Sequence, residues 1–576
     1  MRPTVTFIHS PDVRYDQNYG TLFVPLWAYT LSGYVPATWD KVVVDCVVSD
    51  VNSINESKIF AFSGINQDLE SILEVLSSLQ KRYPAAIYII GGPITWSFQQ
   101  ENKLHLLNDF DHVFILDGEE TLPQFLLDIE SGRQQELERV ITGRRFPISK
   151  SRKLNVYDFG DRLGDYYGGI IEVSRGCPFL CEFCDIRVLP GNNESHNKPV
   201  ELIIGELDEY VSLGVTHFQF ACDNFIGDLR WAEDCVDAIL AWKEKTELNI
   251  SIFTWLTINL YKQTELMRKM RLAGFSILFI GIESVNQNSL LETAKVQNRT
   301  VLETAVKTIQ SFGFVIAPGF IFGFDSDRDS MFSDTLEFMS EAGIIGGDPS
   351  FLMALPGTPL YDRMKKADRL VDETERGTTR EKISTNIKYI QDSDKLVQGF
   401  IEFVARYTSA DYQLDRFRKH IEGITESSNY IASNDIGYGS PREYLRLQFK
   451  DPVSREFLVG RLTMIMTRPK MLLALIKGWV LSRRLTKRDH GAVIHFNYWV
   501  YAWTNISLKY KGLSPLDFSL TSVSDTYPRS IKSSEIDDEN SEVQLSDRQK
   551  RKNRRQKELT NRALEDLNKA GADSIV

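Results

Sequence analysis

The sequence has few cysteines, no long uncharged apolar run and no excess of positive charge. Only six of its 576 residues are Cys, too few for a secreted domain held together by disulfides. No run reaches the length of a membrane span, and the first residues lack the basic start and apolar core of a signal peptide, so we expect a cytoplasmic protein. A net charge of -11 argues against a surface built throughout for nucleic-acid phosphates.

The composition and the length indicate a large folded protein. Apolar residues make up 42% of the chain and charged residues 25%, the balance of a globular protein. The length is several times that of an average domain, so more than one domain is expected.

The first 135 residues alternate short apolar runs with amphipathic stretches, which predicts a parallel sheet covered by helices. The expected strands are residues 5–8, 42–48, 58–62, 86–90 and 112–116, with a helix from residue 69 to about residue 79. Such a five-strand doubly wound unit binds ligands beyond the carboxyl ends of its strands, where glycine lets a backbone approach closely. The candidate binding residues there are Ser63, Gly91, Gly92 and Gly118, although glycines at these positions are also ordinary turn residues.

From about residue 169 the pattern changes to repeats of a helix, a glycine and a strand. Expected helices at 199–213, 262–273 and 300–312 are each followed by a glycine, at Gly214, Gly274 and Gly313, the residue that accepts a left-handed helix cap. Together with strands at 169–174, 250–255 and 350–354, the repeats predict six strands of a partial or full parallel barrel. Active residues should lie at the carboxyl ends of those strands.

Beyond residue 365 strand signals fade and a helical region is expected. Residues 457–485 combine apolar side chains such as Trp479 with basic ones such as Lys477. Core packing is the favoured interpretation, and a helix that lies on a membrane surface or faces a lipid substrate is the alternative. The sequence after residue 522 is polar, and the charge run at 550–557 predicts a solvated tail.

The strongest chemical motif is a CxxxCxxC at the end of the first barrel strand, formed by Cys177, Cys181 and Cys184. Three thiolates on a short loop can hold a cubic iron-sulfur cluster and leave one iron without a protein ligand. A structural zinc site is the weaker alternative, because its nearest candidate for a fourth ligand, His196, lies twelve residues further on.

This motif, with an aromatic residue before its last cysteine and at the mouth of a barrel, resembles the radical S-adenosylmethionine (SAM) superfamily. The resemblance implies that Cys177, Cys181 and Cys184 bind a [4Fe-4S] cluster whose open iron chelates SAM. It also implies that an external donor such as flavodoxin or ferredoxin reduces this cluster. By position it further implies SAM contacts at Phe183, near the adenine; Asp223 and Asn224, near the methionyl group; Glu283, near the ribose; and Gly319 and Gly323, on the adenine side.

A doubly wound domain directly upstream makes the chain similar to cobalamin-binding radical SAM enzymes. The phrases SRGCPFLCEFCDI, DNFIGD, GFIFGFDSD and ALPGTPL look most like the hopanoid C-2 methylase branch. No DxHxxG motif is present, so the resemblance implies cobalamin bound without a histidine ligand, or a domain that has lost cobalamin. The implied domains are a cobalamin-binding-like domain (1–140), a radical SAM partial barrel (141–365), a helical region (366–520) and a disordered tail (521–576).

The resemblance implies a cobalamin-dependent methyltransferase that acts on an unactivated carbon of a small apolar molecule, with a lipid-like substrate as one candidate. A cobalamin-assisted cyclase or rearrangement enzyme is the alternative within the same superfamily. A different class also stays open, namely a zinc-stabilised binding protein whose basic tail contacts nucleic acid, although nucleic acid is the less favoured partner.

Overall fold

The structure is a computed structural model that describes residues 2–12, 23–166, 168–189, 191–295, 302–371, 383–432, 452–486 and 493–523. The chain divides into two compact units. The first draws on the described residues of Met1–Glu172, His196–Phe218 and Gly439–Leu458, and the second on those of Val173–Ser195, Gln219–Tyr438 and Val459–Val576. The predicted charge run at 550–557 lies outside the described residues.

The first unit contains a parallel sheet in the order β2-β1-β3-β4-β5-β6. Its strands are β1 (Thr4–His9), β2 (Asp40–Asp45), β3 (Ile59–Ser63), β4 (Ile87–Gly91), β5 (His112–Ile115) and β6 (Val140–Thr142). The sequence predicted the first five strands and missed β6. That strand is three residues long and half-exposed, so it lacks the buried apolar run by which the others were recognised.

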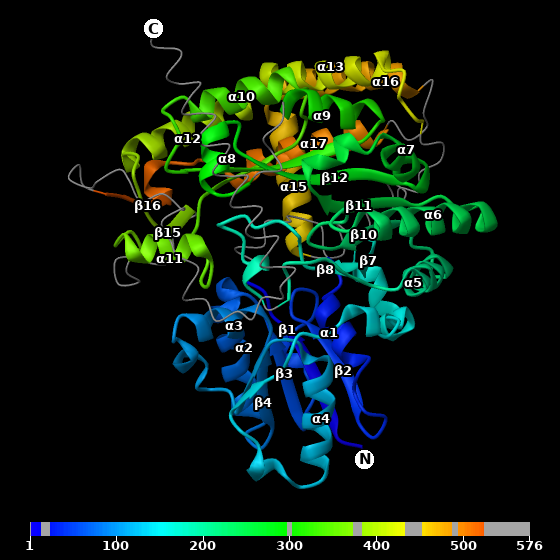
Figure 1. Ribbon diagram of the computed structural model, residues 1–576, viewed down its shortest axis with the longest axis vertical. Helices are drawn as coiled ribbons and strands as arrows, with labels where there is room; N and C mark the ends of the chain where they lie inside the picture. The colour runs from blue at the N-terminus through cyan, green and yellow to red at the C-terminus, as the bar shows by residue number, and fades with distance from the viewer. Residues whose placement is uncertain are drawn as a thin grey trace. The chain divides into compact units, whose positions relative to one another are not determined.

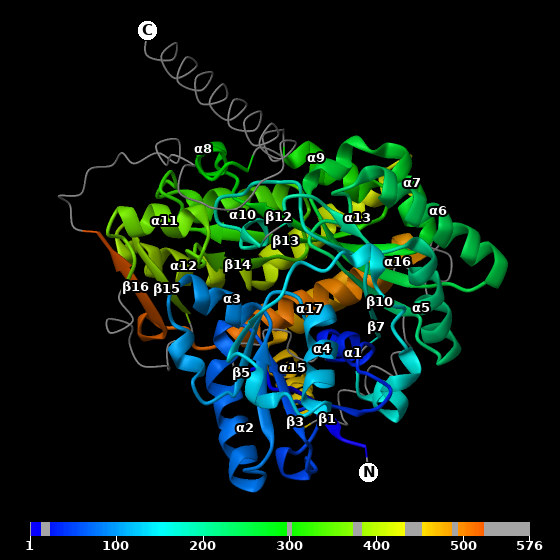
Figure 2. The same cartoon turned by 60° about the horizontal axis from the view of Figure 1, so that its bottom comes forward.

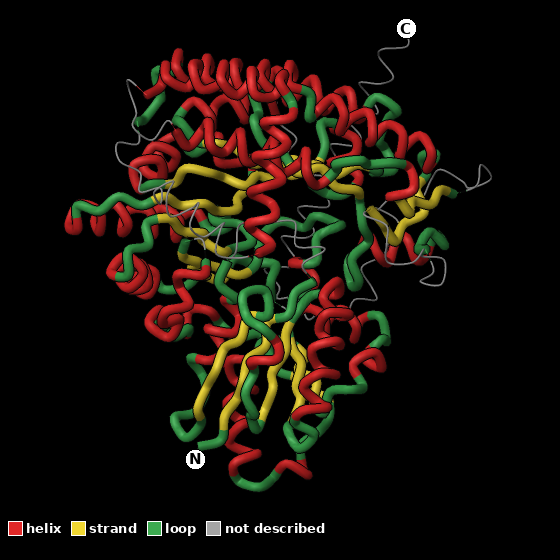
Figure 3. The backbone as a smooth tube through the Cα atoms, turned by 180° about the vertical axis from the view of Figure 1, so that it is seen from behind, coloured by secondary structure: helices red, strands yellow, loops and turns green. Residues whose placement is uncertain are grey.

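Four helices cover the two faces of this sheet: α1 (Leu26–Ser32), α2 (Leu69–Arg82), α3 (Pro93–Gln100) and α4 (Gly118–Glu130) (Figures 1 and 3). Alternate residues of a strand point to opposite faces. Accordingly, Phe60 and Phe62 of β3 pack with α2 and α3, whereas Ile59 and Ala61 pack with α1 and α4. Burial on both faces explains the nearly continuous apolar runs of these strands.

The second sheet has the order β14-β13-β12-β11-β10-β7, in which neighbours in space follow one another along the chain. Its strands are β7 (Gly169–Glu172), β10 (His217–Ala221), β11 (Ser251–Leu256), β12 (Phe275–Glu283), β13 (Val315–Phe322) and β14 (Asp348–Phe351). The short strands β8 (Ser174–Arg175) and β9 (His196–Asn197) pair with each other in a separate two-stranded sheet. The sequence predicted all six strands of the sheet, and the order is that of a partial (β/α) barrel.

In the described part of the chain, seven α-helices lie between or after these strands: α5 (Val200–Ser212), α6 (Leu229–Thr246), α7 (Thr264–Ala273), α8 (Gln287–Glu292), α9 (Leu302–Ser311), α10 (Met331–Glu341) and α11 (Pro359–Lys366). The sequence predicted three of them, α5, α7 and α9. Gly214, Gly274 and Gly313, which follow α5, α7 and α9, have φ angles of 86°, 109° and 101°. A left-handed residue therefore turns the chain from helix towards strand in each repeat.

The region after residue 365 is mainly helical, as expected. Its helices are α12 (Ser393–Tyr407), α13 (Ala410–Glu426), α15 (Pro452–Thr467), α16 (Pro469–Thr486) and α17 (Val493–Lys509). The region also contains two strands that the fading strand signals did not reveal, β15 (Ile383–Tyr389) and β16 (Phe518–Ser522), which form a parallel pair (Figure 2). The predicted tail boundary at residue 521 therefore falls inside β16. Local sequence patterns do not reveal this strand, because its partner β15 lies far away in the sequence.

The apolar and basic segment at 457–485 forms two helices, α15 and α16, with Pro469 at the start of the second. Buried residues of both helices join the core with α13 and α17, among them Met464, Met471 and Leu475. Other apolar residues of the same helices are exposed, including Met466 at 72% and Trp479 at 43%. The core-packing interpretation therefore describes one face of these helices and leaves the opposite face unexplained.

Two buried histidines join α13 to α17. His420 Nε2 lies 2.9 Å from His495 Nδ1, and His420 Nδ1 lies 2.9 Å from Gln310 Oε1. Burial lowers the pKa of His420 to about 3. Burial also lowers the pKa of His495, and the neighbouring His420 and Arg271 lower it further. Both rings are therefore neutral in the folded protein at neutral pH.

The histidine pair predicts that the second unit loses stability in mild acid. Below pH ~6.5 the unfolded chain takes up a proton on His420 that the folded protein accepts only near pH 3, so the free energy of unfolding falls by about 1.4 kcal/mol for each pH unit in that window. Melting curves between pH 7 and pH 5 should show a smaller acid shift for His420→Gln than for wild type. Equal acid shifts of wild type and His420→Gln would contradict this prediction. The control is His105→Gln, which changes an exposed histidine of the first unit.

Candidate active site

The three clustered cysteines lie on the loop after β8. The loop begins at Gly176, whose φ is 89° and whose added Cβ would lie 2.2 Å from the backbone oxygen of Glu194. Only glycine fits there. The Gly176 N–H donates to Asp223 Oδ2 at 2.6 Å, and the Cys177 N–H donates to the Asn192 oxygen at 2.9 Å. Asp223, at the end of β10, therefore fixes the start of the cysteine loop.

The thiols of the loop are close enough to influence one another. Burial raises the pKa of Cys177 to about 11 and also raises that of Cys184, and the neighbouring Cys181 adds to both increases. Within the described ranges, no three His, Cys, Asp or Glu side chains are grouped to hold a single metal ion. A [4Fe-4S] cluster is a wider group that takes one thiolate at each of several corners, and three cysteines on one loop are a suitable donor set for it.

Asn224 presents an unsatisfied polar atom beside this loop. Its side chain is 1% exposed, and its Nδ2 lies 3.9 Å from Cys177 Sγ. Its Oδ1 is buried and has no hydrogen-bond partner. Leaving a buried acceptor without a donor costs about 1–3 kcal/mol, so this oxygen is suited to a ligand that brings an N–H or O–H group. The residues at the end of β10 therefore fit a small polar ligand held next to the cysteine loop.

Glu283 lies at the end of β12 and is paired with a lysine. Its φ is 65°, a left-handed conformation that costs a non-glycine residue about 1–3 kcal/mol and that clusters at functional sites. Lys295 Nζ lies 2.6 Å from Glu283 Oε1 and 5.8 Å from the centre of the Phe183 ring. Burial alone would lower the pKa of Lys295, but the Glu283 carboxylate and the neighbouring Cys181 and Cys184 together outweigh burial and raise it. Lys295 therefore links Glu283 to the aromatic residue of the cysteine loop.

The glycines of β12 and β13 leave room for this carboxylate. A Cβ added to Gly281 would lie 2.3 Å from Glu283 Oε1, and one added to Gly319 would lie 3.1 Å from Phe279 Cζ and 3.8 Å from Glu283 Oε2. Gly323 follows β13 with a φ of 96°, and its added Cβ would meet Tyr389 at 2.5 Å. Gly319 therefore lies beside Glu283, whereas the need for glycine at position 323 comes from packing against β15.

Aromatic side chains continue the face of the sheet that carries Glu283. Trp255 of β11 is opposite Phe279 of β12 in the parallel register, with ring centres 6.5 Å apart. Phe253 lies two residues before Trp255, and their ring centres are 4.7 Å apart. All three side chains are only half-buried, so this face offers an apolar aromatic surface next to the carboxylate.

A second candidate site lies at the carboxyl edge of the first sheet. The sheet is extended from β1 to β2 on one side and from β1 to β3 on the other, so the topological switch point lies between β1 and β3. Ligands bind at this point in such sheets. Ser63 of β3 and Gly91 of β4 are opposite each other in the register. Gly92 has a φ of 85°, and a Cβ there would lie 2.2 Å from Ser63 Oγ. The structure therefore brings Ser63, Gly91 and Gly92 together at this edge.

Gly118 has a different environment. It is the first residue of α4, and its added Cβ would meet the side chain of Leu31 from α1 at 3.2 Å. Helix packing therefore accounts for a glycine at this position.

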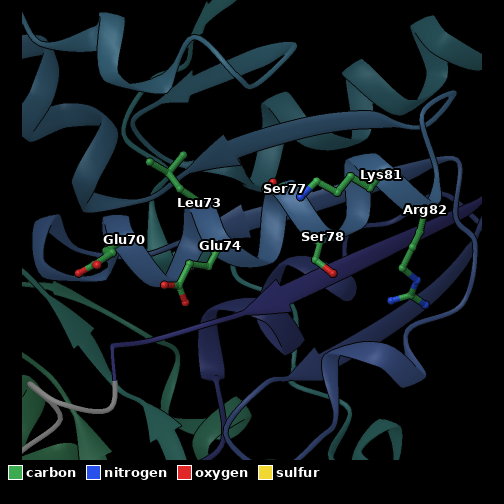
Figure 4. Close-up of a pocket in the computed structure, with 7 residues that line it drawn as sticks. All are labelled: Glu70, Leu73, Glu74, Ser77, Ser78, Lys81 and Arg82. Carbon is green, nitrogen blue, oxygen red and sulfur yellow. The ribbon is translucent and has the colours of Figure 1, made fainter.

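A surface pocket along α2 does not coincide with either candidate site. Seven residues line it, and all of them belong to α2: Glu70, Leu73, Glu74, Ser77, Ser78, Lys81 and Arg82 (Figure 4). Charges of both signs on a single helix do not indicate a ligand class.

Comparison with known families assigns the central part of the chain. Residues 171–339 match the radical SAM superfamily, and this range contains the three cysteines, Asp223, Asn224 and Glu283. The chain contains a radical SAM domain. The family uses a [4Fe-4S] cluster and SAM, as the resemblance carried by the CxxxCxxC motif implied. Residues 358–465 match a domain of unknown function, DUF4070.

The relatives of the radical SAM domain include methyltransferases. An uncharacterised methyltransferase of Synechocystis is 31% identical over 358 residues, which are 61% of this chain and 65% of the relative. The hopanoid C-2 methylase of Rhodopseudomonas palustris is 32% identical over 254 residues, which are 44% of this chain and 47% of the relative. The chain thus spans less than two thirds of the length of these relatives.

The fold is shared with a solved cobalamin-dependent enzyme. The SAM radical enzyme OxsB, in its structure with aqua-cobalamin and SAM, matches 88% of this chain and 79% of its own, with a TM-score of 0.54 and 16% identity. The predicted architecture is confirmed by this match, namely a doubly wound unit, a radical SAM partial barrel and a helical C-terminal region.

Sequence reasoning missed the basic partners of two acidic residues, the predicted site residue Glu283 and Glu182 of the cysteine motif. Lys295, which pairs with Glu283, and Arg363, which pairs with Glu182 inside the cysteine motif, were not identified. A lysine twelve residues beyond Glu283 has no local signature. An acidic residue between two cluster cysteines was a usable signal, because a buried carboxylate needs a cationic partner.

Proposed function

We propose that this chain is a cobalamin-dependent radical SAM methyltransferase that acts on an unactivated carbon. The observation that carries the proposal is the cysteine loop of the radical SAM domain, anchored by Asp223 and flanked by the unsatisfied oxygen of Asn224. We further propose a cobalamin-binding-like domain at 1–140, the radical SAM barrel at 141–365, a helical region at 366–520 and a tail at 521–576, of which the first two residues complete β16.

The residues around the loop have distinct proposed roles. Cys177, Cys181 and Cys184 hold the cluster, and Asn224 Oδ1 accepts a hydrogen bond from the amino group of SAM. Glu283, held by Lys295, accepts from the ribose hydroxyls. When bound, the cluster delivers an electron to SAM and cobalamin carries the methyl group, with flavodoxin or ferredoxin as the class of external reductant.

Cobalamin is assigned to the carboxyl edge of the first sheet. Gly91 and Gly92 have no side chain, so a nucleotide tail can approach their backbone closely. The methyltransferase relatives and the cobalamin in OxsB support this assignment. Because the sequence has no DxHxxG motif, cobalamin would bind here without a histidine from that motif.

An apolar substrate is the class that the site favours. Phe253, Trp255 and Phe279 form a half-buried aromatic row on the same face of the sheet as Glu283. Aromatic faces bind apolar molecules by burying large areas, and the likeness to hopanoid C-2 methylase points to a polycyclic lipid. A cobalamin-assisted cyclase is the second candidate, since it would use the same cofactors.

The experiment that separates these functions uses SAM with a deuterated methyl group. The wild-type protein, reconstituted anaerobically with iron, sulfide and cobalamin, is incubated with a reductant and a hopanoid lipid. Methylation adds the deuterated methyl group to the lipid and releases 5′-deoxyadenosine. A cyclase would change its substrate without gaining label. Absence of both 5′-deoxyadenosine and labelled lipid would contradict the proposed function.

We also propose that α15 and α16 contact a membrane surface. Leu462, Met466, Ile476, Trp479 and Val480 are apolar and exposed. The basic residues of the same helices, Lys470, Lys477, Arg483 and Arg484, are exposed as well. An exposed apolar face with basic residues is suited to anionic lipid, through buried apolar area and electrostatic attraction together. No helix in the described part of the chain is long and apolar enough to span a membrane.

The membrane proposal predicts that Trp479→Glu weakens binding to anionic vesicles. Trp479 is 43% exposed, so the charge should reduce lipid affinity by roughly tenfold without unfolding the protein. Flotation with phosphatidylglycerol vesicles at low and high salt measures this, because salt should weaken the electrostatic part. Leu516→Glu, which alters an exposed leucine outside these helices, is the control. Absence of flotation by wild type at low salt would rule out the contact.

A further inference from the structure

A buried carboxylate lies inside the cysteine motif. Glu182 follows Cys181 directly, and its side chain is 4% exposed. The backbone N–H and carbonyl of Glu182 are both hydrogen-bonded. The N–H donates to the Thr293 carbonyl oxygen at 2.9 Å, and the Glu182 carbonyl oxygen accepts from the Leu360 N–H at 3.2 Å. A carboxylate this deeply buried is costly unless it is paired, and the proposed cluster does not use it as a ligand.

Arg363 of α11 provides the pairing. Its Nε and Nη2 donate to the two oxygens of Glu182 at 2.8 and 3.1 Å, a bidentate contact that fixes the orientation of both groups. Its remaining Nη1 donates to Asp325 Oδ2 at 2.8 Å. Arg363 is itself 4% exposed, so one buried guanidinium joins the cysteine loop to the loop that follows β13.

The loop after β13 is held from its other side. Arg369 donates to both oxygens of Asp325 at 2.8 and 2.7 Å. The N–H groups of Asp325 and Ser326 donate to Glu292 at 2.9 and 2.8 Å. This loop begins at Gly323, the position assigned by resemblance to the adenine side of SAM. Phe324 belongs to the same loop, and the centre of its ring lies 6.1 Å from the centre of the Phe183 ring in the cysteine motif.

We propose that Arg363 is a positioning residue that holds the cysteine loop and the SAM-side loop after β13 as one unit, so that cluster geometry and SAM binding depend on the same buried ion pairs. This inference deepens the proposed function and rests on it. Replacing a buried ion pair by neutral groups is often neutral for stability, whereas removing one partner is strongly destabilising. Stability and positioning can therefore be separated by mutation.

The test compares Arg363→Met with the double variant Glu182→Gln/Arg363→Met. The single variant leaves Glu182 buried and unpaired, and its melting temperature should fall. The double variant removes that charge, so its melting temperature should recover towards wild type. In both variants Arg363 no longer joins the two loops, so the dissociation constant for SAM should rise by roughly tenfold. The change that we expect SAM to cause in the EPR spectrum of the reduced wild-type cluster should be lost in both.

The control is Arg418→Met, which breaks two carboxylate contacts of an arginine that is 43% exposed, to Asp415 and Glu422. It should leave SAM affinity and the EPR spectrum unchanged. A double variant that recovers wild-type SAM affinity together with stability would show that Arg363 only stabilises the fold and would overturn the inference. Wild-type protein that takes up no iron would instead overturn the proposed function, and the inference with it.

Discussion

Replacing Cys181 by alanine should abolish the formation of 5′-deoxyadenosine from SAM. Cys181 lies between Cys177 and Cys184 on the anchored loop and is itself buried. Removing one of three thiolates leaves an iron without its protein ligand, so we expect the loss of cluster and of SAM cleavage by at least about a hundredfold. The same result is expected for Cys177→Ala and Cys184→Ala. The measurement is iron content together with 5′-deoxyadenosine after anaerobic reconstitution.

The controls are cysteines outside the motif. Cys46 follows β2 in the first unit, and Cys235 is fully buried on α6. Cys46→Ala and Cys235→Ala should keep wild-type iron content, because neither thiol lies on the cysteine loop. If Cys181→Ala still produces 5′-deoxyadenosine, the assignment of the cluster ligands is wrong.

Replacing Gly92 by leucine should remove cobalamin from the protein. The backbone at Gly92 is left-handed, and any side chain there would collide with Ser63 Oγ, 2.2 Å from the position of its Cβ. The edge proposed for the nucleotide tail would be blocked. We expect cobalamin retention to fall by at least about tenfold, while the radical SAM domain still cleaves SAM.

A matched control separates blockage from backbone strain. Gly132 belongs to the same unit and is also left-handed, with a φ of 76°, but nothing lies within 4 Å of its added Cβ. Gly132→Leu therefore carries the strain without the collision and should retain cobalamin. Bound cobalamin is measured from its visible absorption. If the wild-type protein takes up none under conditions that load a related enzyme, the first unit is a remnant that no longer binds the cofactor.

Local signals explain why much of the fold was predictable from sequence. Gly214, Gly274 and Gly313 each end a helix in the left-handed conformation, and a residue without a side chain marks such positions in any sequence. The inner strands of the first sheet, β1, β3, β4 and β5, are buried on both faces and show largely apolar runs. The short edge strand β6 lacks such a run, and β15 and β16 pair with each other over a long sequence separation.

Some residues of the candidate site could be predicted from the sequence, and others could not. Cys177, Cys181 and Cys184 are close in sequence, so their spacing alone indicates a cluster. Arg363 lies 181 residues from Glu182, and its partner depends on how strands and loops come together. Sequence patterns identify ligands that share a loop, whereas the residues that hold those ligands in place become visible only in the folded chain.

The cluster claim is tested most directly by one measurement on the wild-type protein. The full chain is reconstituted anaerobically with iron and sulfide, reduced with dithionite and mixed with SAM, and 5′-deoxyadenosine is quantified beside the metal content. We predict about four irons per chain, the absorption of an iron-sulfur cluster and 5′-deoxyadenosine formation that is absent in Cys181→Ala. A protein that binds zinc alone and leaves SAM intact would contradict the account.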